Sequence, residues 1–172
     1  MKVSRVDGNG AVSRKDLKWL SMCEDGARRF STCGKRQYFA IILDRNDHVI
    51  ATGYNGGPSG TVHCDDGGCP RLAANSAPGS NYDNCIAIHA EANAFLHSDY
   101  SDRRDGRGTI FVNGTPCFSC AKLIANSYVE RVVCIADDTY EDWPNVRANL
   151  EDWGIDVCEV PRSAVAKVAD LV

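Results

Sequence analysis

Three short apolar segments in the second half of the chain alternate with three helical patterns, and this alternation restricts the fold more than any other feature of the sequence. The helical patterns lie near residues 86–98, 117–127 and 145–153, and the apolar segments read TIFVNG, RVVCIAD and IDVCEV. Strands that alternate with helices predict a mixed or mostly parallel sheet with helices on both faces. The sequence therefore indicates an α/β fold.

The first half of the chain predicts one helix and a β-hairpin. Ser13 is a suitable N-cap, and the segment after it has the approximate apolar spacing of an amphipathic helix. The apolar residues of this helix are Leu17, Leu20, Met22, Ala27 and Phe30. QYFAIILD and VIATGY are β-branched and aromatic runs on either side of an Asn-Asp turn, which is typical of a hairpin. With the later segments, we expect a three-layer α/β/α fold around a central mixed sheet of about five strands.

The length of 172 residues favours a single domain over residues 13–172, after a flexible lead-in over residues 1–12. No apolar run approaches the roughly 20 residues of a membrane span, and the N-terminus lacks the apolar core of a secretory signal. We therefore expect a cytoplasmic protein with no membrane partner. The formal net charge of -4 disfavours a nucleic-acid polymer as a partner, because such binding needs many Lys and Arg side chains. It does not exclude a small anionic ligand.

A long irregular insert is expected over residues 55–84, which are rich in Gly, Pro, Ser, Asn and Asp and show no sustained period. Such a segment inside a compact domain is usually functional or disordered. The chain also has nine cysteines, and an odd number without an export signal argues against a disulfide framework. Metal binding is the better interpretation of these cysteines.

The stretch IHAEANAF places His89 and Glu91 at the head of an otherwise apolar run that favours a helix. Burying an unpaired carboxylate costs roughly several kcal/mol, so a glutamate so close to the buried face needs a partner or a task. We therefore look for groups elsewhere in the chain that this pair could meet.

The stretch TPCFSC supplies them, because it follows a predicted strand and opens a helix. Pro116 fits the first helical position, and Cys117 and Cys120 are three residues apart, which places both sulfurs on one face of the first turn. A helix N-terminus favours thiolates, the form that binds metals. With His89 they make three zinc ligands and leave the fourth position for water, as a catalytic zinc site requires. Glu91 would then carry protons beside that water.

The combination H-x-E with P-C-x-x-C is the signature of zinc nucleobase deaminases. The chain resembles the cytidine deaminase superfamily, and most closely its deoxycytidylate (dCMP) deaminases. Between Ser31 and about Asp137 the family's elements appear in order, as GYNGGPSG, HC, GC, a further Cys before HAEANA, and PCFSCAKLI. The resemblance implies a cytidine-deaminase-like fold and the zinc-dependent hydrolysis of dCMP to dUMP and ammonia, which supplies dUMP for thymidylate synthesis.

The expected chemistry is a hydroxide attack on C4 of cytosine. Zinc lowers the pKa of its bound water toward about 7, and Glu91 would take that proton, pass it to ring N3 and then to the departing amine. Other substrates would keep the same chemistry: hydroxymethyl-dCMP, dCTP, a nucleoside, or cytosine in RNA or DNA. A catalytically silent zinc-binding protein is a further alternative.

The resemblance also implies a second, structural zinc ion that ties the insert to the first helix. Its candidate ligands are Cys33, Cys64, Cys69 and Cys85, which as four thiolates would make a closed tetrahedral site. His63 could replace one of them, and some of the four could instead be small buried hydrophobic residues. The remaining cysteines outside the catalytic motif lie in periodic apolar segments and are expected in the core: Cys23, Cys134 and Cys158.

In the resembled family, the Asn of the Gly-Tyr-Asn-Gly loop is associated with the sugar hydroxyl and the loop with nucleotide effectors. This implies Asn55 as a sugar contact. Gly53, Tyr54 and Gly56 complete the substrate or effector loop. The family further implies a homo-oligomer, a hexamer in many members, that dCTP activates and dTTP inhibits.

Basic residues that could meet a phosphate are few near these motifs. Lys35, Arg36 and Arg71 are the nearest, and a solvated surface position is an equal alternative for each. The chain also departs from the family at Tyr38 and Phe39, where relatives usually have smaller residues. Packing or an effector site is expected to differ there.

Overall fold

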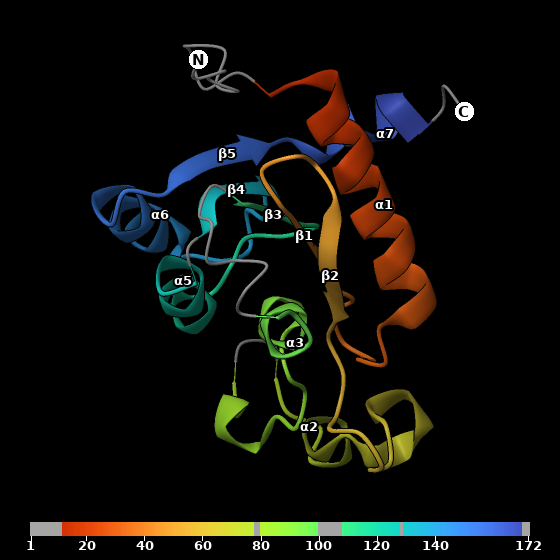
Figure 1. Ribbon diagram of the computed structural model, residues 1–172. Helices are drawn as coiled ribbons and strands as arrows, with labels where there is room; N and C mark the ends of the chain where they lie inside the picture. Colours follow the sequence, from red (N-terminus) through yellow and green to blue (C-terminus); the bar gives the residue numbers. More distant parts are fainter. Residues whose placement is uncertain (1–11, 78–79, 100–107, 128, 170–172) are drawn as a thin grey trace, which may run out of the picture.

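A mixed five-stranded sheet forms the middle layer of the fold, with strand order β2-β1-β3-β4-β5 (Figure 1). The computed structural model describes residues 12–77, 80–99, 108–127 and 129–169. The strands are β1 (Phe39–Leu43), β2 (Val49–Tyr54), β3 (Gly108–Val112), β4 (Val129–Ile135) and β5 (Asp156–Val160). β1 runs antiparallel to both β2 and β3, whereas β3, β4 and β5 are parallel. The expected hairpin and the expected mixed sheet are confirmed.

Helices cover both faces of this sheet, as the α/β/α interpretation requires (Figure 1). One face carries α1 (Arg14–Phe30) and α7 (Arg162–Ala169), and the other carries α3 (Ala90–Leu96), α5 (Phe118–Ala125) and α6 (Trp143–Asp152). Strand β1 is buried on both sides. Ala40 and Ile42 belong to the cluster under α3, α5 and α6, and Phe39, Ile41 and Leu43 belong to the cluster under α1 and α7. Its continuous apolar sequence is therefore that of a central strand.

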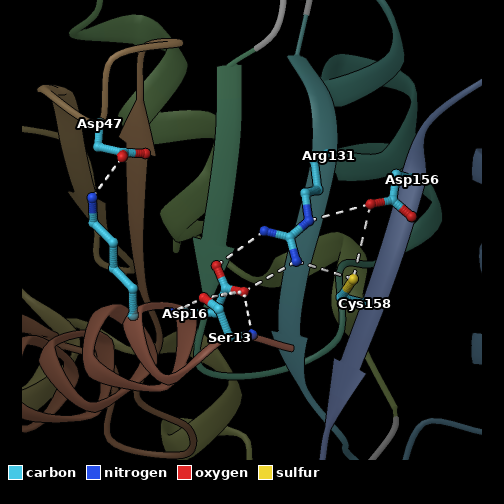
Figure 2. Close-up of polar contacts among 7 residues, drawn as sticks. Ser13, Asp16, Asp47, Arg131, Asp156 and Cys158 are labelled. Atoms are coloured by element: carbon cyan, nitrogen blue, oxygen red, sulfur yellow. Dashed lines mark hydrogen bonds and ion pairs between the residues drawn. The ribbon is translucent and has the colours of Figure 1, made fainter. Parts of the chain in front are cut away.

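Helix α1 begins as predicted, with Ser13 as its N-cap in a capping box that it shares with Asp16. Figure 2 shows how this cap is tied to the sheet: Arg131 on β4 donates to both carboxylate oxygens of Asp16 at 3.0 and 3.1 Å, and to Asp156 on β5 at 3.2 Å. Arg131 thereby joins the N-terminus of α1 to two parallel strands.

The buried face of α1 differs in part from the expected one. Met22 and Phe30 are 53% and 54% exposed, so their expected place in the apolar face was wrong. Leu20 and Ala27 are buried as expected, and Cys23 is buried with them, because spacings of three and four residues keep these three on the side that faces the sheet. Cys134 and Cys158 are also buried, which confirms the expectation that all three of these cysteines lie in the core.

The insert between β2 and α3 contains short helical turns, at the bottom of the view in Figure 1. They are η1 (Cys64–Gly68), α2 (Pro70–Ala73) and η2 (Tyr82–Asn84). Lys35 Nζ donates to the Ser76 carbonyl at 2.7 Å, and Arg71 Nε donates to the Ser80 carbonyl at 3.0 Å while its guanidinium lies over the Tyr82 ring. Lys35 and Arg71, two of the three basic residues that could meet a phosphate, therefore bind backbone carbonyls of the insert.

Residues 1–11 of the expected lead-in lie outside the described residues, and Val12 packs against the cluster under α1 and α7. After Pro161 the chain forms α7. Among the described residues, no helix combines the length and the apolar character needed to cross a membrane.

Candidate active site

Two helix N-termini bring the predicted metal ligands together. His89 is the N-cap of α3, Cys117 is the N-cap of α5, and Cys120 follows in the first turn of α5. The sulfurs of Cys117 and Cys120 lie 3.4 and 3.5 Å from His89 Nδ1, and all three ligand atoms lie within 4.8 Å of one another. The expected position of Pro116 was wrong by two residues, because α5 begins at Phe118 and Pro116 precedes the cap. The spacing of the two cysteines is unaffected.

The donor set fits zinc. One imidazole and two thiol sulfurs are ligands that zinc prefers, and three protein ligands leave a fourth tetrahedral position. Hydrogen bonds from Cys120 and His89 lower the pKa of Cys117, which favours its thiolate form. His89 is exposed and Cys120 is buried, so the cluster opens to solvent on one side. Within the described part of the chain, no other group of three His, Cys, Asp or Glu side chains is this compact.

Glu91 lies in the first turn of α3 and is 5% exposed. Burial raises the pKa of its carboxyl, and its side chain interacts with the thiol of Cys120. A buried carboxyl beside a metal-ligand cluster, with its pKa raised by burial, is placed to take up a proton from a metal-bound ligand. The arrangement therefore agrees with the task expected for Glu91.

The Gly-Tyr-Asn-Gly loop packs directly against α3. A Cβ atom on Gly53 would lie 2.2 Å from the carbonyl oxygen of Ala90 and 2.4 Å from the backbone nitrogen of Ala94, so only glycine permits this approach. Gly56 exchanges two backbone hydrogen bonds with Ile88, at 2.8 and 3.2 Å. These contacts fix the position of the helix that carries His89 and Glu91.

Asn55 and Asn113 hold the start of β1 with matching amide bonds. The Asn55 amide donates to the Arg36 carbonyl at 2.7 Å and accepts from the Tyr38 N–H at 2.8 Å. The Asn113 amide donates to the Gln37 carbonyl at 3.0 Å and accepts from the Phe39 N–H at 2.7 Å. The sequence interpretation overlooked Asn113, although VIATGY and TIFV are both followed by Asn-Gly, which was a usable signal.

Two glycines make room for the large residues at Tyr38 and Phe39. A Cβ on Gly114 would lie 2.4 Å from the Tyr38 ring, and a Cβ on Gly26 would lie 2.8 Å from the Phe39 ring. The unusual pair is thus accommodated by small residues on facing segments. Tyr140 was also overlooked: its side chain lies near Phe118 at the start of α5, within electrostatic reach of Cys117 and Cys120.

The four other candidate zinc ligands gather around the insert. Burial and the adjacent thiol of Cys69, with smaller contributions from Cys33 and Cys85, raise the pKa of Cys64 to about 12. Burial also acts to raise the pKa of Cys69, but hydrogen bonds from backbone N–H groups of α2 and from Cys64 outweigh it and lower that pKa. The four sulfurs interact, but among the described residues they do not form a cluster as compact as the one around His89.

Comparison with known proteins gives a consistent result. The family described as the cytidine and deoxycytidylate deaminase zinc-binding region matches residues 13–136. The chain is 40% identical over 124 residues to the deoxycytidylate deaminase of Mycobacterium phage D29, across 69% of this chain and 91% of that protein. It is 36% identical over 118 residues to the deoxycytidylate deaminase of Schizosaccharomyces pombe, across 69% of this chain. It spans 36% of the length of that yeast relative.

A solved structure shares the fold. The dCMP deaminase from cyanophage S-TIM5, in complex with dCMP and dUMP, superimposes with a TM-score of 0.65 over 87% of this chain and 100% of that one. The sequence identity is 22%, so this similarity concerns the fold. The expected cytidine-deaminase-like architecture is confirmed.

Proposed function

Because this chain belongs to the cytidine and deoxycytidylate deaminase family, we propose that it hydrolyses dCMP to dUMP and ammonia, supplying dUMP for thymidylate synthesis. The observation that carries the proposal is the convergence of His89, Cys117 and Cys120 beside the buried carboxyl of Glu91. The names of the phage and yeast relatives, and the nucleotides bound to the cyanophage protein, support dCMP as the substrate.

In this proposal His89, Cys117 and Cys120 hold a catalytic zinc ion. When bound, zinc supplies a Lewis acid that lowers the pKa of a coordinated water to about 7. Glu91 accepts one proton from the attacking water and delivers it to N3 of cytosine. It then takes the second proton from the new C4 hydroxyl and gives it to the departing amine as the C4–N bond breaks. Its burial suits the first step, because a carboxyl with a raised pKa takes up a proton more readily than it would in water.

Asn55 is proposed to contact the sugar. Its carbonyl oxygen accepts from the Tyr38 N–H and from the Ser31 hydroxyl, and one of its two amide N–H groups donates to the Arg36 carbonyl. An amide nitrogen carries two N–H donors, so among the described residues one is left for a sugar hydroxyl. The same bonds fix the orientation of the side chain.

Replacing Glu91 by Gln tests the reaction, since the amide keeps the shape but cannot carry the proton. Zinc content should remain at the wild-type level while kcat for dCMP falls by roughly 100-fold or more. Glu151→Gln, on the surface of α6, is the matched control and should leave kcat unchanged. Near-normal turnover in Glu91→Gln would refute the role of Glu91.

A substrate panel tests the choice of dCMP. Loss of cytosine absorbance should be fastest with dCMP among dCMP, hydroxymethyl-dCMP, dCTP, deoxycytidine and a single-stranded oligonucleotide. Turnover of nucleosides alone would contradict the monophosphate assignment. Deamination confined to oligonucleotides would indicate an enzyme that edits RNA or DNA. A zinc-loaded protein that is inactive on the whole panel would indicate a catalytically silent zinc-binding protein.

We also propose a structural zinc ion at the insert, held by Cys33, Cys64, Cys69 and Cys85. Their mutual electrostatic influence supports this set. His63 is the alternative ligand, because within the described part of the chain its buried Nδ1 has no hydrogen-bond partner.

Elemental analysis should find two zinc ions per chain. Cys64→Ser should lose one zinc and unfold at a lower temperature, whereas Cys117→Ser should lose the other zinc and remain folded. One zinc ion in the wild type would exclude the structural site.

Finally, we propose that the enzyme is a homo-oligomer, a hexamer, with dCTP and dTTP as effectors near Gly53 to Gly56. Tyr54 and Phe30 support a protein interface here, because they are 41% and 54% exposed and their rings lie 6.2 Å apart. Sedimentation should show the oligomer, and rates should depend sigmoidally on dCMP until dCTP is added. A monomer would contradict the assembly, and hyperbolic curves that neither nucleotide alters would contradict regulation.

A further inference from the structure

Two side-chain amides hold the chain where it enters β1, at residues 36–39. Asn55 follows β2 and Asn113 follows β3, the two strands that flank β1 in the sheet. The Asn55 amide bonds the carbonyl of residue 36 and the N–H of residue 38, and the Asn113 amide bonds the carbonyl of residue 37 and the N–H of residue 39. A residue of a parallel strand makes the same pair of bonds, to residues two positions apart. The two amides therefore continue the sheet beyond the ends of β2 and β3.

Asn55 joins this segment to one metal ligand. Gly56 is next in the chain and exchanges two backbone hydrogen bonds with Ile88, at 2.8 and 3.2 Å. Ile88 directly precedes His89. The position of His89 relative to residues 36–39 is therefore set through Asn55 and the pair of bonds that follows it.

Asn113 joins the same segment to a second metal ligand. Asn113 is 6% exposed, and its backbone is bonded as well as its amide. Its N–H donates to the Phe39 carbonyl at 3.4 Å, and its carbonyl accepts from Arg162 of α7 at 3.4 Å. Cys117 follows four residues later as the N-cap of α5. Asn113 is thus held by β1 and by α7 at the point where the chain leaves β3 for the metal ligands.

The turn over residues 113–117 has little freedom to absorb a movement at its start. Pro116 has a fixed φ angle, and it restricts Thr115 to extended conformations. The Tyr38 ring covers Gly114 so closely that a Cβ there would lie 2.4 Å from it. A displacement of the first residue of the turn is therefore passed on to the last, which is the metal ligand.

We propose that Asn113 is a positioning residue for the catalytic metal site, and that it sets the place of Cys117 relative to His89 through the shared segment at residues 36–39. This inference rests on the proposed zinc-dependent deamination. His89 and Cys117 come from different helices, and one metal ion needs both at bonding distance. Groups that orient metal ligands typically contribute about 10- to 100-fold to metal affinity or activity.

The test replaces Asn113 by Leu, which keeps a similar volume and removes both amide bonds. Transfer of zinc to a chromophoric chelator measures the metal affinity, and Cys117→Ser identifies the part of the signal that belongs to the catalytic site. Catalytic zinc should bind about 10- to 100-fold more weakly in Asn113→Leu, and kcat for dCMP at saturating zinc should fall by a similar factor.

Asn113→Asp is the second variant, for use if Asn113→Leu folds poorly. It keeps the shape and the acceptor for the Phe39 N–H, but it places a carboxylate oxygen against the Gln37 carbonyl. Zinc binding and kcat should again fall. Wild-type zinc affinity and kcat in a folded Asn113 variant would overturn the proposal.

Two controls separate positioning from a general loss of stability. Asn149→Ala removes an amide that donates to a backbone carbonyl at 2.8 Å on α6, and it should change neither value. Asp16→Asn weakens the bonds to Arg131 at the N-terminus of α1, so it should lower Tm while zinc affinity and kcat stay at the wild-type level. If Asp16→Asn weakens zinc binding as much as Asn113→Leu does, metal affinity follows stability and the inference is wrong.

A failure of the proposed function is distinguishable from a failure of this inference. If the wild type binds zinc but deaminates no form of cytosine, the proposed function fails, and the transfer of zinc still tests Asn113. If the wild type is active and Asn113→Leu matches it in zinc affinity and kcat, only the inference about Asn113 fails.

Discussion

Replacing Gly53 by Ala should destabilise the protein, although the backbone conformation favours the opposite result. Gly53 lies in β2 without a positive φ angle, and at such positions a change from Gly to Ala typically stabilises by about 0.4–1 kcal/mol. The added Cβ, however, would lie 2.2 Å from Ala90 O and 2.4 Å from Ala94 N. Both distances are at least 1 Å shorter than ordinary contacts, which begin at 3.4 Å.

The cost follows from which atoms must move. Both close atoms belong to the backbone of α3, so no side-chain rotation relieves the overlap and the helix must shift by about 1 Å. Overpacking of this kind costs roughly 1–3 kcal/mol, and a contact between backbones belongs at the upper end. Each kcal/mol lowers Tm by about 2–4 °C in a chain of this size, so we expect Tm to fall by about 6–12 °C. A shift of about 1 Å at the catalytic groups can also reduce turnover by about 100-fold.

Urea denaturation and calorimetry of the zinc-loaded protein measure the stability, and turnover of dCMP measures the shift of α3. Gly57→Ala is the matched control in the same loop, because its Cβ would meet only side chains at its two nearest contacts, 3.2 and 3.5 Å away. It should change the free energy of unfolding by less than about 1 kcal/mol. Equal or greater stability in Gly53→Ala would refute the argument that glycine is needed for the approach of α3.

Three further changes test other contacts. Burial alone would raise the pKa of Asp16, but hydrogen bonds from Arg131 and Ser13 lower it below 3.8. Asp16→Asn should therefore destabilise the protein by roughly 3 kcal/mol at pH 7. Urea titrations should show this difference in stability shrinking as the pH falls below about 4. Cys117→Ala should lose catalytic zinc and activity together, as measured by elemental analysis and assay. Gly114→Ala should lower Tm, because its Cβ would lie 2.4 Å from the Tyr38 ring.

The metal-ligand cluster was predictable because its geometry is mostly local. His89 caps one helix, and Cys117 and Cys120 share the first turn of another, so two short patterns define three of the four catalytic groups. The strands were predictable for a similar reason: β3, β4 and β5 are buried apolar runs separated by helices.

The parts that sequence reasoning missed depend on contacts between distant segments. The role of Asn113 depends on hydrogen bonds between its amide and the backbone of residues 37 and 39, which are distant in the sequence. The role of Tyr140 depends on the position of its loop beside α5. The space for Tyr38 is provided by Gly114, 76 residues later in the chain. Met22 and Phe30 were misplaced because an approximate apolar period does not fix which side of a helix faces the sheet.

The bond between Asp16 and Arg131 joins residues separated by 115 positions, and this has a consequence for folding during synthesis. Helix α1 leaves the ribosome before β4, so the bond from Arg131 to Asp16 forms only when β4 emerges. At about 5–20 residues per second, that delay is roughly 6–23 s. Over this interval the apolar side of α1, with Leu20 and Cys23, has no finished sheet to cover. The nascent chain therefore passes through a stage in which this helix is exposed to aggregation or to chaperones, and folding waits for a contact of high sequence separation.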